Sequence, residues 1–182
     1  MAQTFYALVA VFSFSLLGLT MHRQTADTER NAIEAEVEAA ALDLALLWSN
    51  RVKALAFDEA DAGARAMRSV RNVTGLTPTD SFGPDASEAT LADYDDVDDL
   101  HGTAVLVEVP LGNGVYAFEV NVSVRYADPL DFERTGVAGP TTAKMVTLTI
   151  ADPGTDLRPP DPAGRHVELT LPVTSVKRHI HW

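Results

Sequence analysis

The chain has 182 residues and a formal net charge of -12, because 26 Asp and Glu residues outnumber 14 Lys and Arg residues. Nucleic-acid binding needs clustered basic side chains that neutralise phosphates, so this composition argues against a nucleic-acid partner. The sequence contains no cysteine, which excludes disulfides, a thiol nucleophile and a thiolate metal site.

The N-terminal segment is uniformly apolar. Residues 2–21 contain no Asp, Glu, Lys or Arg, and a helix of about 20 residues rises about 30 Å, the thickness of the hydrocarbon core of a bilayer. Residues 1–4 carry no basic side chain, whereas a cleavable secretory signal begins with a basic region. We therefore predict a membrane-spanning helix over residues 1–21.

An amphipathic segment follows. Residues 22–57 contain neither Gly nor Pro, and their larger apolar residues recur at spacings of three and four along one helical face. The residues expected to pack on a sheet are Ile33, Val37, Leu44, Trp48, Val52 and Leu55. The pattern predicts one helix of about fifty residues; the alternative is a membrane anchor followed by a separate soluble helix.

The rest of the chain changes from helical spacing to alternation. Residues 58–71 are polar and Ala-rich, which favours a short helix, and residues 72–92 have the Gly, Pro and Ser content of a surface loop. Alternating apolar residues then predict strands over residues 104–109, 115–126, 142–151 and 166–171, the last ending before Pro172. On the longest of these strands, one face is expected to carry Phe118, Val120, Val122, Val124 and Tyr126.

These elements predict an α+β fold, in which the second half of a long N-terminal helix packs on a four- to five-stranded antiparallel sheet. The expected organisation is a stem helix, residues 1–57, and a head, residues 58–182. Within the head, a link at residues 58–102 precedes the sheet at residues 103–182. The amphipathic half of the stem is the natural cover for the apolar face of the sheet.

This arrangement resembles the type IV pilin and pseudopilin superfamily. The likeness covers the whole chain, and two local stretches add to it: DYDDVDDLHG at residues 93–102 and AKMVTLTI at residues 143–150. The chain departs from the family pattern where the family carries a glutamate and a proline, because Phe5 and His22 stand there. The family's leader with its basic residues is also not seen.

The resemblance implies a structural subunit of an extracellular, pilus-like filament at the cell surface. Such a subunit is held in the inner membrane by its N-terminal helix, and then self-associates, with or without other pilin-like subunits, through the same helix. The residues assigned to this membrane and filament-core role are Phe5, Leu8, Val11, Phe12, Leu16 and Gly18. Two alternatives stay open: a membrane-anchored pseudopilin-like component of a secretion or DNA-uptake machine, and a bitopic protein with an unrelated β-domain.

A cluster of acidic residues precedes the first strand. Carboxylates that alternate along a loop suit Ca²⁺, which takes six to eight oxygen ligands, and the candidate ligands are Asp93, Asp95, Asp96 and Asp98, with Asp99 beside them. The spacing lacks the Gly and terminal Glu of an EF-hand loop. The alternative is a solvated acidic loop whose side chains cap turns, so we expect no cofactor, with calcium as the open exception.

Other chemistry has little support in the sequence. His179 and His181 would share one face of a strand and could bind a transition metal together with His166 or His101, but no acidic or sulfur partner accompanies them. The sequence contains no GxSxG elbow, HExxH, P-loop or Gly-rich dinucleotide turn. We therefore predict that the protein is not an enzyme.

Overall fold

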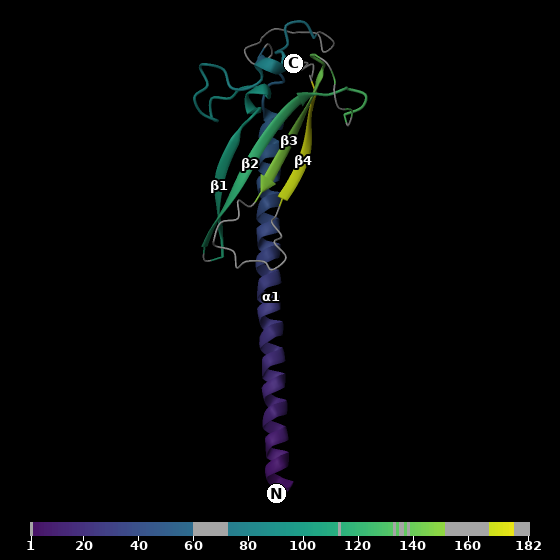
Figure 1. The fold of residues 1–182 in the computed structure, drawn as a ribbon. Helices are drawn as coiled ribbons and strands as arrows, with labels where there is room; N and C mark the ends of the chain where they lie inside the picture. Colours follow the sequence, from purple (N-terminus) through teal and green to yellow (C-terminus); the bar gives the residue numbers. More distant parts are fainter. Residues whose placement is uncertain are drawn as a thin grey trace. The chain divides into compact units, whose positions relative to one another are not determined.

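The computed structural model describes residues 2–59, 73–112, 114–132, 134, 137, 139–151 and 168–176. These residues form one α-helix, two short 3-10 helices and four strands (Figure 1). The chain divides into two compact units, Met1–Ala39 and Ala40–Trp182. The division falls inside the helix, because the last turns of the helix belong to the unit that contains the sheet.

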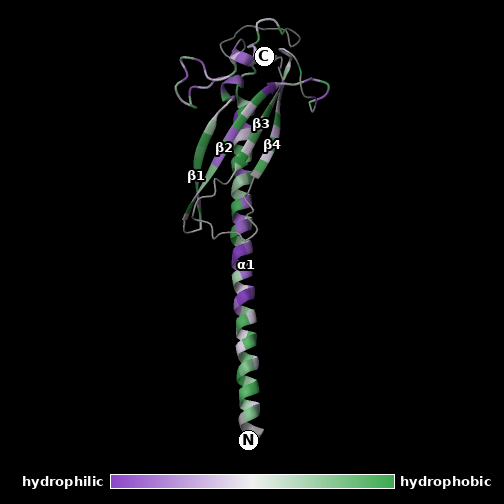
Figure 2. Cartoon of the chain, in the orientation of Figure 1, coloured by the Kyte–Doolittle hydropathy of each residue, from purple (hydrophilic) through white to green (hydrophobic). Residues whose placement is uncertain are grey.

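The helix α1 begins at Ala2 and ends at Ala54, so the prediction of one long helix is confirmed. No proline interrupts its hydrogen-bond ladder, and Gly18 is its only glycine. Figure 2 shows apolar residues dominating the N-terminal end of α1, with hydrophilic residues appearing further along it. The apolar and amphipathic halves are therefore consecutive parts of a single element.

The sheet has four antiparallel strands in the order β1-β2-β3-β4, and each strand pairs with its neighbour in sequence. Their bounds are β1 Ala104–Leu111, β2 Gly114–Tyr126, β3 Ala143–Ala151 and β4 Glu168–Val176. The pairs Val107↔Phe118, Val122↔Leu148 and Val146↔Val173 fix the register across the sheet. Val and Thr recur along these strands, in keeping with the preference of β-branched residues for a pleated surface.

One face of the sheet is buried, as the alternation predicts. On β2 the buried residues include the predicted set Phe118, Val120, Val122, Val124 and Tyr126. The end of α1 within the same unit contributes Leu44, Trp48 and Val52, all of which are buried. The predicted α+β fold, a helix packed against an antiparallel sheet, is therefore confirmed.

The buried stripe of α1 is shorter than predicted. Val37 is buried and Leu55 is half-buried, but Ile33 is 46% exposed, so its assignment to the packing stripe is wrong. Helical spacing identifies a face, but it carries no information on where along the helix the cover ends. Ile33 lies on the correct face, one turn before burial begins.

The last strand continues further than expected. A strand interrupted at Pro172 was the prediction, whereas β4 passes through Pro172 to Val176. In the described sheet β4 is an edge strand, and an edge strand tolerates a residue without an N–H group. A fifth strand after residue 176 and most of the expected helix over residues 58–71 fall outside the described residues.

Candidate functional site

The first half of α1 exposes its apolar side chains. Every side chain from residue 5 to residue 21 is exposed, and Leu8 reaches 72%. This set contains all the residues assigned to the membrane and filament-core role: Phe5, Leu8, Val11, Phe12, Leu16 and Gly18. Because exposure of so much contiguous apolar surface to water is unfavourable, this segment requires lipid or protein neighbours.

The Ser and Thr side chains in this segment are satisfied within the helix. The hydroxyls of Ser13, Ser15 and Thr20 donate hydrogen bonds to the carbonyl oxygens four residues earlier, at 2.8, 2.9 and 2.9 Å. A hydroxyl that has its partner inside the helix can enter hydrocarbon without losing a hydrogen bond to water. These residues therefore do not conflict with the apolar character of the segment.

A second feature is a buried lysine in the sheet unit. Lys144 follows the first residue of β3, on the same face as Val146, Leu148 and Ile150, and its side chain is 0% exposed. Its ammonium group donates hydrogen bonds to the Phe57 carbonyl oxygen at 2.6 Å, to Asp58 Oδ2 at 3.0 Å and to Asp98 Oδ1. All three donors of the ammonium group are therefore used.

Aromatic rings enclose the same ammonium group. Nζ of Lys144 lies 4.6 Å from the ring centroid of Phe57, 5.3 Å from that of Phe82 and 5.4 Å from that of Tyr126. Each ring presents a partial negative charge to a cation within this range. We call the group of Lys144, Asp58, Asp96, Asp98 and these three aromatic residues the Lys144 cluster.

Backbone pairing brings the acidic residues of the cluster together. Immediately after α1, the Ala56 N–H donates to the Asp95 carbonyl oxygen at 3.0 Å, and the Val97 N–H donates to the Ala56 carbonyl oxygen at 3.1 Å. This short parallel bridge sets Asp58 beside the segment that carries Asp96 and the 3-10 helix Asp98–Leu100.

Tyr126 and Thr77 hold the Asp58 carboxylate. The Thr77 N–H donates to Asp58 Oδ2 at 3.0 Å, and the Tyr126 hydroxyl donates to the Thr77 carbonyl oxygen at 2.8 Å. Burial, followed by the charge of Asp58, raises the pKa of Tyr126. The phenol therefore stays neutral and acts as a hydrogen-bond donor.

Burial also changes the acidity of two aspartates. The pKa of Asp96 rises to about 9, chiefly because its carboxyl group is buried and then because Asp98 is negatively charged nearby. Burial raises the pKa of Asp99 to about 7, although the hydrogen bond from the Asp96 N–H to Asp99 Oδ2, 3.0 Å long, lowers it. At neutral pH Asp96 is therefore protonated and can donate a hydrogen bond.

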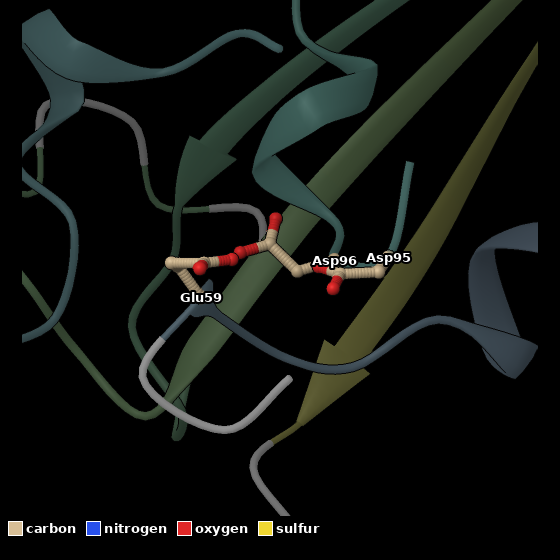
Figure 3. Close-up of side chains that lie close together, drawn as sticks. All are labelled: Glu59, Asp95 and Asp96. Atoms are coloured by element: carbon tan, nitrogen blue, oxygen red, sulfur yellow. The ribbon is translucent and has the colours of Figure 1, made fainter. Parts of the chain in front are cut away.

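The structure does not bring the carboxylates of all four aspartates that were expected to form one calcium site into a single described group. Asp93 accepts hydrogen bonds from the Thr90 N–H and hydroxyl at 2.9 and 2.8 Å, so it has a turn-capping role, and Asp98 is paired with Lys144. Asp95 and Asp96 do come together, but with Glu59 as the third member (Figure 3).

Two groups of three carboxylates have oxygen atoms that lie within 4.8 Å of one another: Glu59, Asp95 and Asp96, and Glu88, Asp95 and Asp99. Their oxygens are of the type that a hard cation takes as ligands. However, Asp96 Oδ1 already accepts the Asp98 N–H at 2.7 Å, and Asp99 Oδ2 accepts a backbone N–H. Some of these carboxylate oxygens are therefore already occupied by local backbone hydrogen bonds.

Sequence reasoning missed Lys144 and Asp58. The signal for Lys144 was present, because the alternation of Val146, Leu148 and Ile150, extended back by one step, puts residue 144 on the buried face. A lysine at that position predicts a buried counter-ion. No local pattern, however, identifies Asp58, which lies 86 residues away in sequence.

Of the four histidines considered as transition-metal ligands, the structure describes one. His166, His179 and His181 lie outside the described residues. His101 is described, and its Nδ1 accepts a hydrogen bond from the Val124 N–H at 3.0 Å. Since that nitrogen is occupied, His101 has a structural role in joining the segment before β1 to β2.

The fold and these features define only a broad class of protein. The chain is an α+β protein whose N-terminal helix is long and apolar enough to cross a membrane, a test that a membrane anchor and a signal sequence both pass. Comparisons with protein-family models, with curated proteins and with solved structures found no match for this chain. A narrower functional assignment therefore depends on the physical features above.

Proposed function

We propose that this chain is a structural subunit of an extracellular pilus-like filament. In this proposal the N-terminal helix holds the subunit in the inner membrane before assembly, and the same helix is bundled with its copies in the filament core. The proposal concerns self-association, with other pilin-like subunits as further partners, and involves no catalytic step.

The exposed apolar half of α1 is the observation that carries this proposal. From residue 5 to residue 21 all side chains are exposed and none is charged. Hydrocarbon tails and the apolar faces of neighbouring helices are similar environments, so one sequence suits both. When a subunit moves from the membrane to a filament, the apolar side chains of α1 therefore stay buried, and the transfer costs little free energy.

Two further observations favour protein neighbours over lipid alone. A Cβ atom added at Gly18 would meet no atom within 4 Å, so no contact in the described chain requires glycine at this position. Leu42, Leu46 and Leu47 are 53%, 59% and 65% exposed, although they lie well beyond the apolar segment. Close helix approach at a small residue and exposed leucines on the amphipathic half both suit contacts between copies.

A membrane-anchored pseudopilin-like component of a secretion or DNA-uptake machine is the second candidate. The specific observation in its favour is that residues 2–21 contain no carboxylate, whereas subunits of long filaments in this superfamily usually carry one in the apolar segment. Such a component would stay in the membrane or join only a short assembly.

Cysteine cross-linking in cells can separate these candidates, because the chain has no native cysteine. A variant with Leu8→Cys and Leu16→Cys should give an oxidised ladder of multimers in filaments sheared from the cell surface. The matched control carries Glu108→Cys and Ser123→Cys, at exposed positions of β1 and β2, and should not give the ladder.

Negative-stain microscopy of the sheared material and mass spectrometry of its subunits complete the test. Filaments that contain the chain, together with the ladder, support the filament proposal. A chain recovered only from detergent-extracted membrane, without filaments or ladder, would contradict it and favour the accessory role.

A further inference from the structure

The proposed filament assembly through α1 assigns no role to the side chains of the Lys144 cluster. A primary amine and the carboxyl group of Asp98 are in direct contact, with side chains that are 0% and 4% exposed. The Asp58 carboxylate is paired with the same amine, and the Asp96 carboxyl group lies beside that of Asp98. An amine, a carboxyl group, a base and an acid are the components of an amide condensation.

We propose that Lys144 and Asp98 are joined by an intramolecular isopeptide bond, which forms in the folded protein with the loss of one water molecule. The bond would link Nζ of Lys144 on β3 to Cγ of Asp98 in the 3-10 helix that precedes β1. The structure holds the two groups in the non-covalent contact that precedes such a bond.

Asp58 is positioned as the base for this pair. A buried ammonium–carboxylate pair is costly to desolvate, and its conversion to a neutral amide removes that cost. Only a neutral amine has the lone pair needed to attack a carbonyl carbon. Asp58 Oδ2, 3.0 Å from Nζ, is positioned to accept the proton that the amine gives up.

Asp96 is positioned to supply the proton that the carboxyl group needs. Its side chain is within hydrogen-bonding reach of Asp98, and its raised pKa keeps it protonated at neutral pH. Asp98 Oδ2 is buried and has no hydrogen-bond partner among the described residues. A proton donated by Asp96 would satisfy this oxygen and make it a better leaving group.

The condensation balances without an added reactant. Nζ of Lys144 attacks Cγ of Asp98, a C–N bond forms, and one C–O bond breaks. Two of the three ammonium protons leave with that oxygen as water, and the third stays on the amide nitrogen. Asp58 and Asp96 relay protons and return to their starting states, so no oxidant, reductant or activated ester is required.

The surroundings favour the product. The rings of Phe57, Phe82 and Tyr126 enclose the amine, and exclusion of water slows the reverse hydrolysis. Amide formation also replaces two buried charges by a neutral group, which removes their desolvation cost. In the product the Asp58 carboxylate no longer faces a cation, but it keeps its hydrogen bond from the Thr77 N–H.

Intact mass spectrometry of the purified full chain, in denaturant, tests the proposal. We expect a mass lower than the sequence mass by one water molecule. Proteolysis should yield a branched peptide that joins the segment of Asp98 to that of Lys144, and a lysine-specific protease should not cleave after residue 144. The branched peptide distinguishes the bond from dehydration elsewhere in the chain.

Substitutions test which two residues are joined by the proposed bond. Asp98→Ala and Lys144→Arg should have the mass of their sequences, and the control Lys53→Arg, at an exposed lysine, should keep the mass deficit. Asp98→Asn should lose ammonia in place of water, and Asp96→Asn should slow bond formation at least tenfold. A wild-type chain of unchanged mass, with a Lys144 amine that reacts with an acylating reagent after denaturation, would overturn the proposal.

Discussion

The first half of α1 and the Lys144 cluster depart from the usual distribution of polarity in opposite directions. In α1, apolar side chains such as Leu8 are exposed, whereas in the cluster the charged Lys144 is fully buried. Both departures are costly unless a partner compensates for them. Within the cluster the partners are in the same chain, and for α1 the proposed partners are lipid or other protein chains.

This difference separates the stability of the molecule from its assembly. The cluster holds the end of α1, the 3-10 helix Asp98–Leu100 and β3 together through one side chain. A change in the cluster should therefore act on folding, and a change between residues 5 and 21 should act on the environment that the chain occupies.

Replacement of the buried cation should have the largest effect. In Lys144→Met the buried Asp58 and Asp98 carboxylates lose their ion pairs with Nζ, and the proposed bond to Asp98 cannot form, so we expect the free energy of unfolding to fall by about 3–5 kcal/mol. Urea unfolding of the detergent-solubilised full chain measures it. The control Lys53→Met, at an exposed position, should change stability by less than about 0.5 kcal/mol. Equal stability of the two variants would show that the cluster does not support the fold.

A charge in the apolar half of α1 should act on membrane association instead. Val11→Lys is expected to cost about 3 kcal/mol of insertion free energy, with little change in the urea unfolding of the sheet. Alkaline extraction of membranes should release this variant while the wild type stays in the pellet. Its matched control is Glu38→Lys, at an exposed position of the amphipathic half. If both variants remain in the pellet, the segment from residue 5 to residue 21 does not act as the anchor.

The acidity of Asp96 gives a pH-dependent effect. Because its pKa is raised to about 9, the folded state keeps a proton that the unfolded state loses above about pH 4. The unfolded state therefore binds fewer protons, and stability falls as pH rises, by at most about 1.4 kcal/mol per pH unit. Asp99, with a pKa raised to about 7, adds to this slope only below neutrality.

Asp96→Asn should remove the part of this slope between about pH 7 and pH 9. The amide oxygen of asparagine can still accept the Asp98 N–H that Asp96 Oδ1 accepts at 2.7 Å, so the loop should be preserved. The control is Asp93→Asn, which changes an exposed aspartate and should keep the wild-type slope. Parallel curves of stability against pH for wild type and Asp96→Asn would mean that Asp96 is ionised in the folded state.

Most of the fold could be predicted from the sequence, because helices and strands are recognised by the periodicity of their apolar residues. Alternation identified the buried face of β2 from Phe118 to Tyr126, and spacings of three and four identified Leu44, Trp48 and Val52. Such patterns are local and can be read along the chain. They also predicted the exposed apolar segment, since it is defined by the absence of charge.

The Lys144 cluster could not be predicted from local sequence patterns. Its members Asp58, Asp98 and Lys144 are distant in sequence and meet only because α1 ends where Ala56 can pair with Asp95 and Val97. The acidic loop was recognised as a group of possible calcium ligands, although Asp98 is used by the lysine. Composition reveals that charges are present but not which of them become buried together.

The smallest expected effect concerns the limit of burial along α1. Ile33 and Val37 lie on the same helical face one turn apart, yet Ile33 is 46% exposed and Val37 is 1% exposed. Val37→Ala should lower the free energy of unfolding by about 1–2 kcal/mol through a cavity, whereas Ile33→Ala should change it by less than about 0.5 kcal/mol. Urea unfolding of the detergent-solubilised full chain measures both. Equal losses at the two positions would mean that Ile33 is covered as well, and that the exposed part of α1 begins closer to the N-terminus.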